Sequence, residues 1–155
     1  MVAATICSFQ MHKIIARHSK WWYLSRMDKK TQTWLTIAEN DLEFAEQILQ
    51  NKQRPPYSLH FCHQAVEKIL KATIQYGTGK VPPRTHNLEI LLQLIQKELP
   101  PDKMDALVKL APHYLGTRYP DDLAKFHQQY SEEFVQSRLE ETKELFAWIK
   151  NHWLT

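Results

Sequence analysis

Two basic side chains, Lys80 and Arg84, lie on a short segment stiffened by two consecutive prolines. Cations held on a rigid loop suit the recognition of phosphate, because little conformational entropy is lost when they bind it. Lys68 and Lys71, in the preceding segment, either extend this basic patch or stay solvated. We therefore take Lys80 and Arg84 as the local patch best suited to a phosphate.

Three histidines lie near this patch in the sequence. His60 and His63 are one helical turn apart, with Glu67 a further turn on, and such spacing can hold a metal ion. No carboxylate-rich partner helix accompanies them, so we expect His63 to pack at the edge of an apolar stripe and predict no metal site. His86 is either a helix-entry residue satisfied by local hydrogen bonds or a pocket residue beside Arg84. We include it among the candidate phosphate-binding residues.

The segment 59–73, LHFCHQAVEKILKAT, has the clearest helical pattern of the chain. Apolar residues recur along it at steps of three and four, which predicts a helix with one buried face. The opposite face carries Gln64, Glu67, Lys68 and Lys71. Glu67 precedes Lys71 by one turn, so the pattern predicts an exposed ion pair that contributes roughly 0.2–0.5 kcal/mol.

Four further segments have the same periodicity, so the sequence predicts an all-α, up-and-down bundle of about five helices. The expected helices are residues 31–50, residues 57–76, a third from about residue 85 with a stripe reaching Leu99, a shorter fourth from Pro101, and residues 131–153. The last segment has large apolar residues beside its stripe, namely Phe134, Leu145 and Trp148. They indicate either a dimer surface or an ordinary thick core.

The charge distribution separates residues 1–26 from the rest of the chain. These residues hold four of the 20 basic side chains and no acidic one, whereas the remainder carries 16 basic and 17 acidic side chains. We predict a basic extension outside the domain over residues 1–26, with Met27 as a natural start, and a single domain over residues 27–155. The near-neutral body argues against a protein that reads DNA sequence.

The remaining composition predicts a cytoplasmic protein. No stretch approaches the apolar length of a membrane span, so no membrane association is expected. The two cysteines, Cys7 and Cys62, form no metal or redox pattern, and Cys62 falls on the apolar stripe as an inert thiol in a reducing compartment. We expect no cofactor.

Three stretches resemble the HEPN domain family. They are Gln64 to Ala72 (QAVEKILKA), Thr85 to Leu88 (THNL) and Arg118 to Asp121 (RYPD), in the family's order and spacing. The resemblance implies a small, all-helical prokaryotic domain that is usually a homodimer. It also implies binding of nucleotide or RNA, and a minimal nucleotidyltransferase as partner in a toxin–antitoxin pair.

The resemblance to HEPN ribonucleases implies catalytic roles for Arg118 and His127. The arginine would hold the scissile phosphate and the histidine would move a proton, without a metal ion. His127 lies further from Arg118 than in the family's motif, so the motif is incomplete. Arg118 is alternatively a clamp that pairs with Glu67 or another carboxylate. Tyr119 either shapes the connector or joins Arg118 at a phosphate.

Three functions follow from these observations. We expect a module that binds nucleotide or RNA phosphate and a nucleotidyltransferase-like partner. The first alternative is a metal-independent endoribonuclease toxin that uses Arg118 and His127. The second is a purely structural subunit, in which the matching residues serve only the fold.

Overall fold

The computed structural model describes residues 27–51, 55–113 and 130–155. These residues form five α-helices and no strand. The helices are α2 (Lys29–Gln50), α3 (Pro56–Thr78), α4 (Leu88–Ile95), α5 (Pro101–Leu110) and α8 (Glu132–Trp153). The expected all-α bundle of about five helices is therefore confirmed. Residues 1–26, the predicted basic extension, lie outside the described part of the chain.

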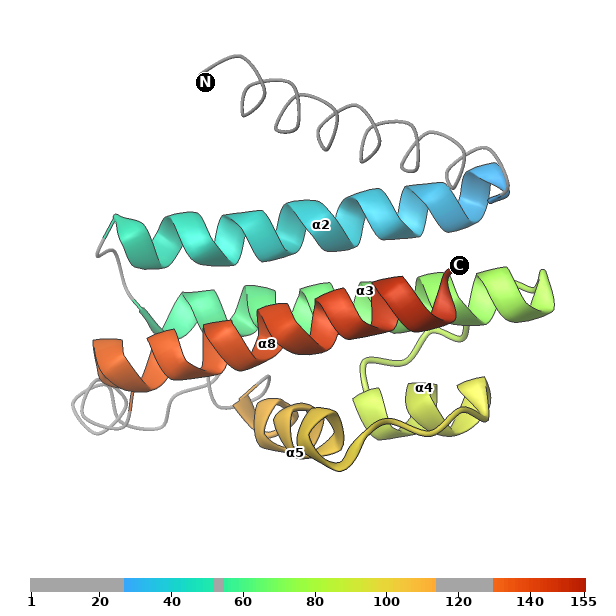
Figure 1. Ribbon diagram of the computed structural model, residues 1–155. Helices are drawn as coiled ribbons and strands as arrows, with labels where there is room; N and C mark the ends of the chain where they lie inside the picture. The colour runs from blue at the N-terminus through green and yellow to red at the C-terminus, as the bar shows by residue number, and fades with distance from the viewer. Residues whose placement is uncertain (1–26, 52–54, 114–129) are drawn as a thin grey trace, which may run out of the picture.

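The central helix of the bundle is α3. It contacts α2, α4, α5 and α8, and Figure 1 shows it between α2 and the pair formed by α4 and α5. Its core face carries Leu59, Val66 and Ile69, none of which has exposed surface. None of the described helices is long and apolar enough to cross a membrane.

Two ion pairs show how α8 is oriented relative to α2. Lys143 on α8 pairs with Glu46 on α2 at 2.6 Å. Seven residues later on α8, Lys150 pairs with Glu39, which lies seven residues earlier on α2. The two helices are therefore antiparallel, and Figure 1 shows α3 also antiparallel to α2.

Short polar side chains begin three of the helices. The side chain of Asp28 accepts a hydrogen bond from the backbone N–H of Thr31 at 2.8 Å, and Ser131 and Asn87 cap α8 and α4 in the same way. Such caps satisfy backbone donors that the first helical turn leaves unpaired. Gly79 ends α3 with φ 67°, in the left-handed region that favours glycine.

The third helix ends earlier than the apolar stripe indicated. Gln96 adopts φ 55°, and this left-handed residue terminates α4 one residue after Ile95. Leu99 therefore lies outside the helix, although its side chain is still buried in the core. The stripe identified a buried residue correctly and its secondary structure wrongly.

The core accounts for the large apolar residues of the last helix. Leu145 has no exposed surface, and Phe134 and Trp148 pack partly buried against the core cluster. The thick-core alternative therefore explains these three residues. Homodimer formation stays a prediction that does not depend on them.

Candidate functional site

The carboxylate of Glu67, on α3, is the centre of a buried polar cluster. The residue is 1% exposed. One carboxylate oxygen, Oε1, accepts a hydrogen bond from Lys71 Nζ at 2.7 Å, and the other, Oε2, lies 2.9 Å from Nδ1 of His86. The two oxygens thus bind two different segments of the chain.

The prediction that Glu67 and Lys71 form an exposed pair is wrong. Lys71 is 6% exposed, and its Nζ lies 5.5 Å from the centroid of the Trp34 ring on α2. The α2 helix and the loop before α4 cover this face of α3, which the helical pattern alone assigned to solvent. The pair is consequently a buried charge pair, for which the loss of one partner is costly.

A second lysine, Lys68, forms a longer ion pair with the same carboxylate. Lys68 Nζ lies 3.9 Å from Glu67 Oε1 and 4.0 Å from a carboxylate oxygen of Asp41 on α2. It also donates a hydrogen bond to Gln64. Two carboxylates and two ammonium groups therefore balance one another where α2 faces α3.

The cluster keeps Glu67 ionised. Burial alone would raise the pKa of the Glu67 carboxyl, but the hydrogen bonds from Lys71 and His86 and the charge of Lys68 together hold it below its usual value. An ionised carboxylate only accepts hydrogen bonds. Nδ1 of His86 is therefore the donor in its contact with Glu67.

The loop between α3 and α4 carries three of the predicted phosphate-binding residues. Lys80 and Arg84 are exposed on it, and the His86 side chain is 59% exposed. Local hydrogen bonds alone do not hold His86, because it also contacts Glu67, which lies 19 residues earlier in the chain.

Four structural features define the course of this loop. Gly79 ends α3, and Pro82 is buried. His86 binds Glu67, and Asn87 accepts hydrogen bonds from the first backbone N–H groups of α4 at 2.9 and 3.1 Å. Lys80, Arg84 and His86 therefore lie on one loop, which contacts the bundle at Pro82 and at His86.

Two other reactive side chains of α3 are buried. His63, predicted to pack at the edge of the apolar stripe, is 2% exposed, and burial lowers its pKa to about 4 despite the nearby Glu67. Burial raises the pKa of the Cys62 thiol to about 12. Within residues 27–51, 55–113 and 130–155, no three histidine, cysteine, aspartate or glutamate side chains are placed to hold a metal ion.

Arg118, Tyr119 and His127 lie outside the described residues, in the connector 114–129. The residues that flank this connector meet: Nδ1 of His113 and the hydroxyl of Tyr130 are 3.1 Å apart. The catalytic roles of Arg118 and His127, and a clamp between Arg118 and Glu67, stay predictions.

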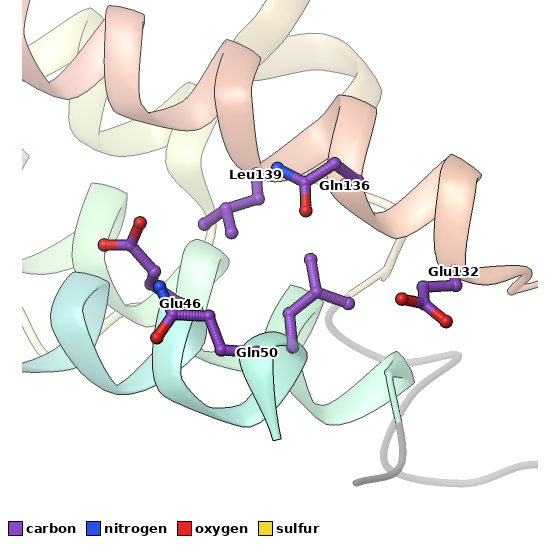
Figure 2. Close-up of a pocket in the computed structure, with 6 residues that line it drawn as sticks. Glu46, Gln50, Glu132, Gln136 and Leu139 are labelled. Carbon is purple, nitrogen blue, oxygen red and sulfur yellow. The ribbon is translucent and has the colours of Figure 1, made fainter. Parts of the chain in front are cut away.

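A pocket of about 170 Å³ lies between the end of α2 and the beginning of α8. Its lining residues are Glu46, Leu49, Gln50, Glu132, Gln136 and Leu139, and Figure 2 shows the polar ones arranged around the opening. None of the predicted site residues lines it. Glu46 is paired with Lys143, and the lining residues include no lysine or arginine, so this pocket offers no cation to a phosphate.

Comparison with known proteins supports a family assignment. The family model for the HEPN domain matches residues 31–152. The fold is similar to the crystal structure of TT1696 from Thermus thermophilus, with a TM-score of 0.69 and 23% identity over 80% of this chain and 98% of that chain. It is also similar to ST0689, described as an archaeal HEPN homologue, with a TM-score of 0.63 and 19% identity over 81% of this chain and 98% of that chain. No curated protein sequence matches significantly. The chain belongs to the HEPN domain family.

Proposed function

We propose that this HEPN domain binds the phosphate of a nucleotide or of RNA at the loop between α3 and α4. The observation that supports this is the tethered loop, which carries the exposed side chains of Lys80, Arg84 and His86. A positively charged fork such as that of Arg84 suits bidentate contact with phosphate oxygens. Arg118 and Tyr119, which the family resemblance assigns to the same ligand, complete the proposed site.

The charges around the loop favour an anion. Glu67 is the carboxylate that contacts His86, and Lys71 already compensates it at 2.7 Å. Asp41 lies near Lys68 in the same way. The cations of the loop therefore keep their attraction for a phosphate, since the neighbouring carboxylates are offset by lysines of α3.

Replacement of Arg84 tests this function. We expect Arg84→Ala to weaken ATP binding in EDTA roughly ten- to a hundredfold, because a charge-assisted hydrogen bond contributes about 1.5–3 kcal/mol. Lys80→Ala should weaken ATP binding less, since a lysine ammonium is a point charge and cannot make the bidentate contact of a guanidinium. Isothermal titration calorimetry of the purified protein measures both.

Lys97→Ala is the matched control, because it removes one exposed positive charge just after α4. Its ATP affinity should equal that of the wild type. Unchanged affinity in both loop variants would contradict the proposed site. Cleavage of RNA in EDTA, lost in Arg118→Ala and His127→Ala, would instead favour the endoribonuclease alternative.

We further propose that the domain acts in the cytoplasm as a homodimer with a minimal nucleotidyltransferase partner. The support for this is family membership and the order of the three matching stretches. We expect a tagged chain, purified from its natural host, to carry the product of the adjacent gene, identified by mass spectrometry. Analytical ultracentrifugation of the protein alone should give the mass of a dimer. A monomer that captures no second protein would refute this part of the proposal.

A further inference from the structure

The two oxygens of Glu67 connect the interior of the bundle to the candidate phosphate site. Oε1 accepts from Lys71, which is buried against Trp34 of α2, and Oε2 binds His86 on the exposed loop. A continuous set of contacts therefore runs from α2 through α3 to the loop. Among these four side chains, Glu67 alone is negatively charged.

We propose that Glu67 is a positioning residue, which fixes the His86 ring and thereby holds the α3–α4 loop so that His86, Arg84 and Lys80 can contact one phosphate together. This inference rests on the proposed function of the loop. The contact is suited to that role because Glu67 is 1% exposed whereas the His86 side chain is 59% exposed. A buried carboxylate that binds two side chains orients the ring: Nδ1 donates to Glu67, and Nε2, when it also carries a proton, can donate to a phosphate oxygen.

The geometry predicts that glutamine cannot replace Glu67. The ammonium of Lys71 only donates hydrogen bonds, so the amide oxygen of a glutamine would turn toward Lys71. The amide nitrogen, also a donor, would then face Nδ1 of His86. Two donors repel each other, so a ring that keeps its proton on Nδ1 must rotate away from α3.

The proposal and simple electrostatics predict effects of opposite sign. Glu67→Gln removes a negative charge near a site for an anion, and that change alone strengthens the binding of phosphate. Loss of the orientation of His86 weakens it. The direction of the change in affinity therefore separates a positioning role from the effect of a nearby charge.

A double-mutant cycle with ATP as the probe tests the proposal. Titrations in EDTA should show that Glu67→Gln weakens ATP binding about tenfold in the wild-type background, and not at all when His86 is already alanine. Glu89→Gln removes an exposed carboxylate from the first turn of α4, and should leave the affinity unchanged or slightly increased. Stronger binding by Glu67→Gln, or an equal loss in the His86→Ala background, would overturn the proposal.

A spectroscopic measurement separates this inference from the proposed function. Long-range ¹H–¹⁵N spectra of the folded protein should show His86 with its proton on Nδ1, and Glu67→Gln should abolish that signature. If the wild type binds no ATP, the function of the loop fails, whereas this change in the spectrum still supports the positioning role. An unchanged His86 spectrum in folded Glu67→Gln would overturn the role of Glu67 whatever the affinity.

His86→Gln, which leaves Glu67 in place, keeps the test informative if Glu67→Gln does not fold. This variant should weaken ATP binding, and unchanged affinity would count against the proposal.

Discussion

Glu67→Ala is expected to lower the free energy of unfolding by about 3–5 kcal/mol, the usual cost of breaking a buried ion pair from one side. The variant removes the carboxylate that lies 2.7 Å from the ammonium of Lys71, a residue that is only 6% exposed in the wild type. It also frees the His86 ring from α3, which removes a tether of the following loop. Urea denaturation monitored by circular dichroism measures the change.

Two further variants identify the cause of that loss. Glu43→Ala, which removes an exposed glutamate from α2, should change the free energy of unfolding by no more than about 0.5 kcal/mol. The double variant Glu67→Leu with Lys71→Met removes both charges, and it should recover at least half of the loss. If the double variant is as unstable as Glu67→Ala, the buried charge of Lys71 is not the cause.

Acidification from pH 6.5 to pH 4 is expected to cost about 3 kcal/mol of stability through His63 alone. Burial lowers the pKa of this histidine to about 4, from 6.5 in an unfolded chain. Between these values the unfolded chain binds a proton at this position and the folded chain does not. Stability therefore falls as the pH drops through that window. The lowered pKa of Glu67 acts at lower pH, where its protonation removes a further stabilising contribution.

His63→Leu tests this assignment, because leucine fills the buried position and does not titrate. Its free energy of unfolding should fall less than that of the wild type between pH 7 and pH 4.5, measured by urea denaturation at both values. Some pH dependence should persist, since burial and Arg138 also lower the pKa of His113. Equal slopes for His63→Leu and for a control at the exposed His152 would rule His63 out.

Local sequence signals predicted most of the fold. The beginnings of the helices follow from capping side chains such as Asp28 and Asn87, and the end of α3 follows from Gly79. These signals act over a few residues, so they can be identified without knowledge of the fold. The end of α4 was missed because it depends on Gln96 in the left-handed conformation. Glutamine rarely adopts this conformation, so the sequence gives no signal for it.

The candidate site was predictable only in part. Proximity in the sequence was enough to group Lys80, Arg84 and His86. The role of Glu67 was missed because periodicity reports which face of α3 is apolar, and not which faces its neighbours cover. A polar residue between two covering segments looks the same in the sequence as one in solvent. The available signal was that the stretches containing Glu67 and His86, residues 64–72 and 85–88, both match the same family.

The pairing of α2 with α8 also has a consequence for the order of assembly during synthesis. The contacts of Lys143 and Lys150 with α2 span 97 and 111 residues, whereas only residues 51–55 separate α2 from α3 in the sequence. The α2–α3 hairpin can therefore form while α8 is still inside the ribosome. Until α8 arrives, the part of the central helix that α8 covers stays exposed, so the nascent chain passes through a stage in which it is prone to aggregate.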